Sequence, residues 1–297
     1  MRQARFMTET QRDDRIVTVG VDGSDGSVFA LQWALDHADH LGAIEPVMTF
    51  VSGPFEYGFD EIDESEDTGE PYRSDAVLRL QTFLQAHAPS LVDAGVVIEY
   101  RAGPGLLKAA QTAELLVVGT RGWSARADLS VGSVGAYCAH HATVPVALIP
   151  HDVPAAHDHL DVIVGFDGSP HARNALRWAL THLRHAARVT AVRAFTDESV
   201  VGEPLAPSPG AAEAIAREEL EDGVATVLRG LTGHAPVELL VLPGDPRSVL
   251  RVASEGADLL VIGARGHGVL EHLLLGSVSS AIAHHPTIPT IIVPHHR

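Results

Sequence analysis

The chain has 297 residues, 45% hydrophobic and 20% charged, a balance typical of about two folded domains and not of a disordered or fibrous protein. Its 38 acidic and 21 basic side chains leave a formal net charge of −17, so we expect no nucleic acid and no membrane surface as partner. One cysteine, Cys138, is too few for an intrachain disulfide or a thiolate metal cluster. The start of the chain is polar, and no run approaches about 18 apolar residues, so we expect a cytoplasmic protein.

Four sequence segments occur twice, at an offset of 145 residues for the first two and 144 for the others. The pairs are VGVDGS and VGFDGS (19–24, 164–169), ALQWAL and ALRWAL (30–35, 175–180), VVGTRG and VIGARG (117–122, 261–266), and VPVALIP and IPTIIVP (144–150, 288–294). The repeat predicts two domains built alike. We place a flexible tail at 1–14, domain 1 at 15–150, a linker at 151–159 and domain 2 at 160–297.

Within each half, strand signals alternate with helical stretches. In the first half a β-branched run at 16–21 precedes a helix that places apolar residues between 30 and 41 on one face. We then expect strands at 46–51, 96–101, 115–119 and 146–149, and helices at 74–93, 106–112 and 132–141. Short apolar strands separated by helices predict a parallel sheet covered on both faces, with ligands outside the carboxyl ends of the strands.

The segment between Gly53 and Pro71 carries eight acidic side chains. Their mutual repulsion favours a solvated, mobile loop, with a lid or a metal trap as the alternative. The corresponding segment of the second half, 202–210, is rich in proline, so the two share no chemistry and the role of the acidic loop 56–70 stays open.

The strongest motif pairs Gly119 and Gly122, after a strand, with Gly132 and Ser133 at the start of a helix, and it recurs at the same spacing in the second half. Glycine lets the backbone approach a ligand closely, and the unpaired N–H groups of a first helical turn attract phosphate oxygens. For a single motif of this kind, a turn glycine and a helix-capping serine are the better explanation. Its duplication favours a phosphate cradle in each half.

A second motif, Asp22-Gly23-Ser24, ends the first strand and recurs as Asp167-Gly168-Ser169. A carboxylate at that position can accept hydrogen bonds from a ribose hydroxyl or a base amine. The alternative is that the aspartate and the serine only cap the following helix.

These motifs and the terminal VPVALIP resemble the universal stress protein family, in its ATP-binding, tandem-domain branch, from about Arg15 to Pro294. The resemblance implies an α/β fold of two doubly wound, five-stranded parallel-sheet domains of order 3-2-1-4-5, like the adenine nucleotide α-hydrolases. It also implies pairing between the last strands of the two halves. Each domain would hold one ATP, with Mg²⁺ bridging the phosphates.

The resemblance also assigns the nucleotide-binding residues. Asp22 and Asp167 would contact the adenosine, the backbone of Val51 and Ala194 the adenine, and the glycine loops with the helix starts the ribose and phosphates. The residues assigned are Asp22, Gly23, Ser24, Val51, Gly119, Gly122, Gly132, Ser133 and Val134, and Asp167, Gly168, Ser169, Ala194, Gly263, Gly266, Gly276, Ser277 and Val278. We expect no catalytic residue and no metal held by side chains.

Several features stand outside this pattern. The first half has Gly103-Pro104-Gly105 where the second keeps the family's Gly244-Asp245-Pro246, which makes the first pocket the less regular one. The histidine pairs at 140–141 and 284–285 end equivalent helices, where capping is favoured over metal binding. Cys138 is predicted to be a packed thiol and not a nucleophile.

Three functions follow as hypotheses. The first is an ATP-binding regulator of stress response or growth with little or no ATP turnover, whose partner is a signalling protein or a second copy of the chain. The second is an interaction scaffold that needs no nucleotide. The third is an ATP-splitting, adenylating enzyme, although GVDGSDGS after the first strand differs from the SGGxDS-like loop that such chemistry requires.

Overall fold

The computed structural model describes residues 15–52, 70–121, 132–151, 159–196, 210–266 and 275–294. The tail 1–14, most of the linker (152–158), the acidic segment 53–69 and the proline-rich segment 197–209 lie outside the described residues, so the expectations for them stay predictions. None of the described helices is both long and apolar enough to cross a bilayer.

Each half alternates strands and helices along the chain. The first half contains β1 (Ile16–Gly20), α1 (Asp25–Asp36), α2 (Ala38–Leu41), β2 (Ala43–Phe50), α3 (Glu70–His87), β3 (Val96–Glu99), α4 (Ala102–Ala109), β4 (Leu115–Gly119), α5 (Ser133–His141) and β5 (Val146–Ile149). The second half contains β6 (Asp161–Gly165), α6 (Pro170–His182), β7 (Arg188–Phe195), α7 (Ala211–Leu228), β8 (Val237–Pro243), α8 (Pro246–Ala253), β9 (Leu259–Gly263), α9 (Ser277–His284) and β10 (Thr290–Val293).

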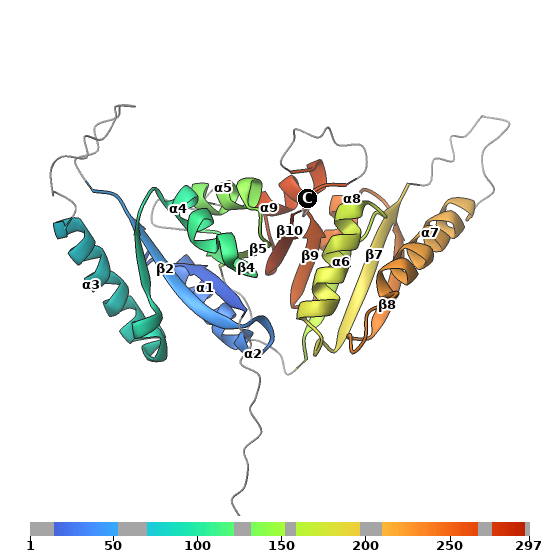
Figure 1. Ribbon diagram of the computed structural model, residues 1–297. Coiled ribbons are helices and arrows are strands. Elements are labelled where there is room, and N and C mark those ends of the chain that lie inside the picture. Colours follow the sequence, from blue (N-terminus) through green and yellow to red (C-terminus); the bar gives the residue numbers. More distant parts are fainter. Residues whose placement is uncertain are drawn as a thin grey trace, which may run out of the picture.

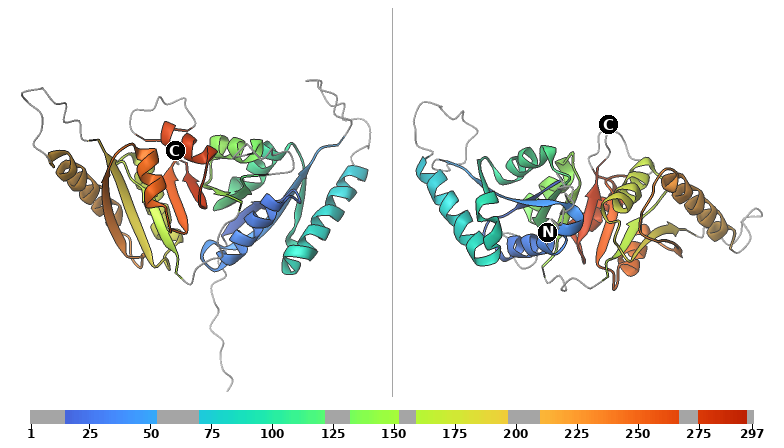
Figure 2. Two further views of the ribbon diagram at one scale, coloured as in Figure 1. Left: turned by 180° about the vertical axis from the view of Figure 1, so that it is seen from behind. Right: turned by 60° about the horizontal axis from the view of Figure 1, so that its bottom comes forward.

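All ten strands form one sheet of order β3-β2-β1-β4-β5-β10-β9-β6-β7-β8. Each half has the predicted order 3-2-1-4-5, with parallel pairing throughout. The last strands of the halves pair antiparallel, with Ile291 opposite Ala147, which confirms the pairing that the resemblance implies. Figure 1 shows the blue-to-green and yellow-to-red halves side by side at this junction, and both views of Figure 2 agree.

Helices cover both faces of the sheet and bury two apolar cores. The first core packs α1, α3, α6 and α7 against the sheet, with Leu31, Leu84, Leu176 and Leu220 almost fully buried. The second core lies on the other face, under α4, α5, α8 and α9. Because each core runs through both halves, the junction is part of the hydrophobic interior and not a separate surface contact.

Three helices differ from their predicted bounds. The predicted helix 74–93 runs from Glu70 to His87 and is followed by a 3-10 turn at Pro89–Ala94, because the residue before a proline disfavours the α conformation. The helix expected through 30–41 breaks at His37 into α1 and α2. The helix predicted at 106–112 begins already at Ala102, since Pro104 lies in the first turn, where its missing N–H costs nothing.

Candidate functional site

The Asp-Gly-Ser motif forms the same turn in both halves, at the carboxyl end of the first strand. One oxygen of Asp22 accepts hydrogen bonds from the N–H of Ser24 at 2.9 Å and from its hydroxyl at 2.5 Å. Asp167 accepts from the N–H of Ser169 at 2.9 Å. Gly23 and Gly168 have φ values of 88° and 82°, a left-handed conformation that favours glycine. The turn therefore holds a carboxylate at each strand end.

Both serines of this motif cap helices, as the alternative interpretation predicted. The hydroxyl oxygen of Ser24 accepts from the N–H of Ser27 at 3.4 Å, and that of Ser169 accepts from Ala172 at 3.1 Å. In the first half Ser27 completes the turn, because its hydroxyl donates to the Ser24 carbonyl and accepts from the Gly23 N–H. The hydroxyls of Ser24 and Ser169 are thus engaged in the fold.

The strand-ending glycines Gly119 and Gly263 pack against protein backbone. A Cβ on Gly119 would lie 2.3 Å from the carbonyl oxygen of Gly26, and one on Gly263 would lie 2.7 Å from the carbonyl carbon of His171. Gly26 and His171 both lie in the first turn of a helix that follows an Asp-Gly-Ser turn. At these two positions close helix–strand packing by itself requires glycine, whether or not a ligand binds.

In the second half the other glycines converge on the aspartate. A Cβ on Gly266 would lie 2.5 Å from the second carboxylate oxygen of Asp167, and one on Gly276 would lie 3.5 Å from the Gly266 nitrogen. The N–H of Gly276 donates to the Ala264 carbonyl at 2.8 Å, which closes the loop onto the strand end. Asp167, Gly266 and Gly276 therefore form one glycine-lined wall.

The described residues of the first half contain the same hydrogen bond between the helix start and the strand end. The N–H of Gly132 donates to the Thr120 carbonyl at 2.5 Å, at the position equivalent to the bond of Gly276. Gly122 lies outside the described residues. In the first half the structure therefore describes the Asp22 turn and this closing bond, and not the glycine that would face Asp22.

The helices α5 and α9 begin at this wall with free first-turn N–H groups. The first helical hydrogen bonds run from Ala136 to Gly132 at 3.1 Å and from Ser280 to Gly276 at 2.8 Å. The three N–H groups before each of these donors have no acceptor within the helix, and the helix dipole adds positive potential there. Ser133 and Ser277 are exposed, while Val134 and Val278 are half-buried.

The two residues assigned to adenine are not structurally equivalent. Phe50 and Phe195 end β2 and β7, so Val51 follows its strand whereas Ala194 lies inside its strand, opposite Leu242. The residue that matches Val51 in the second half is Thr196. Both strands present backbone groups towards the first strand of their half, where the Val21 N–H donates to Val47 at 2.9 Å and Phe166 N–H to Val192 at 2.8 Å.

Sequence reasoning missed two residues that shape the loops. Gly26 accommodates the Arg121 carbonyl, which would lie 1.8 Å from an added Cβ. The second Asp-Gly in VDGSDGS was its only sequence signal. Ser279 donates from its hydroxyl to the Ala264 carbonyl at 2.6 Å and so ties α9 to its loop. Its counterpart in the first half is Gly135, so the two loops are secured differently.

Cys138 is fully buried, as expected for a packed thiol. Its sulfur lies 4.0 Å from the Gly103 carbonyl oxygen, and burial raises the thiol pKa to about 12. A thiol in this state is not a nucleophile at neutral pH.

The repeated tryptophans and the helix-ending histidines have structural partners. Trp33 and Trp178 are buried and stack on His37 and His182, at ring-centroid distances of 4.6 and 4.7 Å. His141 caps its helix, since its Nδ1 lies 2.9 Å from the Tyr137 carbonyl oxygen. Among the described residues, no group of three or more histidine, cysteine or acidic side chains could hold a metal ion.

The chain is similar to known proteins over nearly its whole length. The pattern of the universal stress protein family matches residues 15–150 and again 160–294. The universal stress protein Rv2005c of Mycobacterium tuberculosis is 31% identical over 288 residues, which cover 93% of this chain and 96% of that protein. Rv1996, a universal stress protein of the same organism, is 29% identical, with 93% and 94% covered.

A solved structure shares the tandem fold. A universal stress protein of Archaeoglobus fulgidus superposes with a TM-score of 0.61 at 20% identity, over 95% of this chain and 98% of that one. The chain is thus a tandem α/β protein, in which each half carries an Asp-Gly-Ser turn and a glycine loop at the strand ends. The chain belongs to the universal stress protein family and contains two of its domains.

Proposed function

We propose that the protein is an ATP-binding regulator with one nucleotide site in each half and little or no ATP turnover. One observation carries the proposal: in the second half a carboxylate, two glycines and a helix start with free N–H groups share one wall. Gly266 lies so close to the carboxylate that a Cβ added to it would be 2.5 Å from an oxygen of Asp167. Such a wall offers an acceptor to a ribose or a base and donors to phosphate oxygens.

Different residues of each site would bind different parts of the nucleotide. Asp22 and Asp167 would accept hydrogen bonds from the adenosine. The backbone of Val51, just after β2, and of Ala194, near the end of β7, would meet the adenine. The loops and helix starts would bind the phosphates; they comprise Gly119, Gly122, Gly132, Ser133 and Val134, and Gly263, Gly266, Gly276, Ser277 and Val278. Mg²⁺ would be held through phosphate oxygens.

We expect ATP binding without rapid hydrolysis, because the carboxylates at the site already serve structural roles. Phosphoryl transfer needs a group that orients the attacking water and positioned charge at the transferred phosphate. The carboxylates of Asp22 and Asp167 are held in their turns by the serine N–H groups, and the serine hydroxyls cap helices. We therefore expect the site to retain ATP and to signal its presence.

Calorimetric titration of the intact chain with ATP and Mg²⁺ tests the proposal, together with mass spectrometry of any ligand released on denaturation. We expect saturable binding, and two sites if both halves bind. The double variant Asp22→Asn/Asp167→Asn keeps an oxygen that can accept the turn hydrogen bond but loses both charges, and we expect it to bind at least tenfold more weakly. Asp161→Asn is the matched control, because Asp161 begins β6, at the opposite edge of the sheet.

The outcomes separate the three hypotheses. No binding by the folded chain at millimolar ATP would leave a nucleotide-independent scaffold. Release of AMP and pyrophosphate in the presence of an acceptor would indicate an adenylating enzyme. If ATP acts as the regulatory signal, cells that carry the double variant should differ from wild type in growth or stress survival, whereas cells with Asp161→Asn should not.

A further inference from the structure

Histidines at equivalent positions of the two halves meet across the junction. His40 and His185 lie 145 residues apart in the sequence, and His140 and His284 lie 144 apart, the offsets of the repeat. Their ring centroids are 5.6 Å apart in the first pair and 6.3 Å in the second. Because β5 and β10 pair antiparallel, equivalent residues near the junction face one another. One pair joins α2 to the turn that follows α6, and the other lies at the ends of α5 and α9.

On the α1 and α6 side of the sheet, the imidazoles have acidic partners in the other half. His182 Nε2 lies 3.3 Å from an oxygen of Glu114, the residue just before β4. The equivalent residues, His37 and Asp258, repeat this relationship: burial lowers the pKa of His37, and the charge of Asp258, with that of Asp36, opposes the shift. At His37 the attraction offsets only part of the cost of burial, because its pKa stays below the ordinary value.

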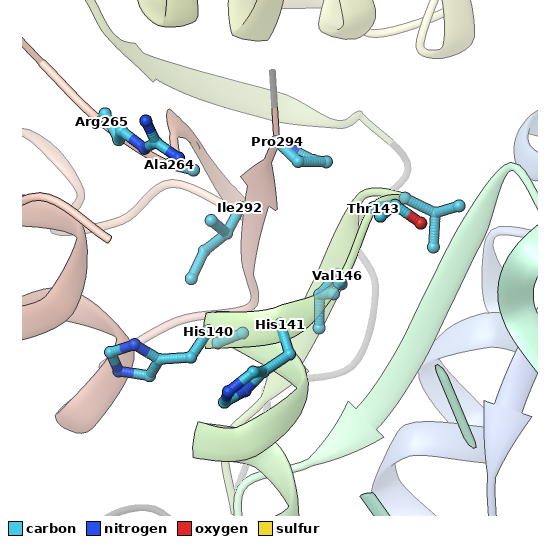
Figure 3. Close-up of a pocket in the computed structure, with 11 residues that line it drawn as sticks. His140, His141, Thr143, Val146, Ala264, Arg265, Ile292 and Pro294 are labelled. Atoms are coloured by element: carbon cyan, nitrogen blue, oxygen red, sulfur yellow. The ribbon is translucent and has the colours of Figure 1, made fainter. Parts of the chain in front are cut away.

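On the α5 and α9 side, the groups near the junction are basic. His140 faces His284, at 6.3 Å, and His141, at 6.4 Å. His140 and His141 also line a cavity of about 240 Å³ whose opposite wall carries Arg265 and Pro294 (Figure 3).

The neighbouring elements of this side add further positive charge. The adjacent helix α8 contributes Arg247 and Arg251 to a second cavity of about 150 Å³ beside His285, and Arg251 also pairs with Glu255 at 3.6 Å. On α4, which packs along α5, the Lys108 ammonium lies over the Tyr100 ring, 5.4 Å from its centroid.

The sign of the pH effect follows from His140. Burial first, and then the neighbouring His284 and His141, lower its pKa below the ordinary value of about 6.5. Because the pKa of His140 is lowered while β5 and β10 are paired, its imidazole takes up a proton more readily once the halves separate at the junction. Acidification therefore favours the loosened state, and stability is retained above about pH 6.5.

We propose that the contact between His140 and His284 is an acid-sensitive element that loosens the pairing of β5 and β10 when the pH falls below neutrality. The ladder it acts on is short, with Thr290, Ile291 and Ile292 opposite Leu148, Ala147 and Val146. A small free-energy change therefore alters how often this ladder opens. The inference does not depend on nucleotide binding.

Amide hydrogen exchange of the full-length chain tests this inference, at pH 7.5 and 5.5 and with rates corrected for their intrinsic pH dependence. We expect protection in β5 and β10 to fall on acidification, by at most about tenfold, which is the limit set by the uptake of one proton between pH 6.5 and 5.5. Protection in β2 and β7, which lie away from the junction, should change less. The double variant His140→Gln/His284→Gln and the single variant His284→Gln should both reduce the effect.

The controls make the experiment decisive. His87→Gln alters an exposed imidazole on α3 and should keep the wild-type response. Circular dichroism confirms that each variant is folded. Equal protection at both pH values, an unchanged response in folded variants, or an equal loss in all strands would overturn the proposal. So would a response that EDTA abolishes, because a bound metal ion would then be its cause.

Discussion

Gly119 and Gly26 approach so closely that the carbonyl oxygen of Gly26 lies 2.3 Å from where a Cβ of Gly119 would be. This contact locks the end of β4 to the first turn of α1, so the glycine loop and the Asp-Gly-Ser turn of the first half are parts of one unit. The same relationship joins Gly263 to His171 in the second half. A substitution such as glycine to alanine, which changes no charge and removes no hydrogen-bond donor, can therefore still disturb the site.

Gly119→Ala should destabilise the fold by about 1–3 kcal/mol or more, because backbone and not a flexible side chain must move. Gly165→Ala, at the end of β6, is the matched control. There the three atoms nearest to the added Cβ belong to the side chains of Ile262 and Leu250, at 3.1–3.3 Å. Urea unfolding of both variants measures the difference, and equal losses would contradict the predicted packing.

Ser169→Ala should cost about 1–2 kcal/mol of stability, because it removes the buried cap of α6. Ser169→Thr, which keeps a hydroxyl, should recover part of the loss. Ser24→Ala should cost less, since the corresponding bond in the first half is longer, at 3.4 Å. Thermal unfolding at pH 7.5 provides the comparison, and the reverse order of Ser24→Ala and Ser169→Ala would show that other interactions dominate these turns.

Cys138 should resist thiol reagents in the native protein, because burial excludes the reagent and raises the pKa of the thiol to about 12. Labelling with a chromogenic disulfide at pH 8 should be slow in buffer and complete in denaturant. Rapid labelling of the folded chain would show that α5 opens readily. Cys138→Ala should leave ATP affinity unchanged if the thiol only fills the core.

His37 should contribute to acid sensitivity on the other side of the sheet. Burial lowers its pKa, so its contribution to stability is complete above about pH 6.5 and is lost as the pH falls below that value. His37→Gln should flatten the decline in the urea midpoint between pH 7.5 and 5.5, although it also removes the stacking on Trp33. An unchanged slope would mean that other groups govern the acid response.

The repeat in the sequence determined the doubled α/β organisation and the identity of the motif residues, whereas the strand order 3-2-1-4-5 came from the resemblance to the family. The glycines and the aspartates recur at fixed offsets, and periodicity alone predicted the strands 115–119 and 146–149 with their observed bounds. Local pattern succeeds here because short buried strands and the turns that follow them depend on neighbouring residues.

Tertiary structure decided which residues work together. Only the folded chain shows that Gly119 packs against Gly26, that Gly266 faces Asp167, and that Ala194 does not occupy the position of Val51. The histidines that meet at the junction come from segments more than a hundred residues apart, and their environment depends on which neighbours the antiparallel pairing of β5 and β10 brings near. Such contacts depend on long-range packing and burial, which no local sequence pattern encodes.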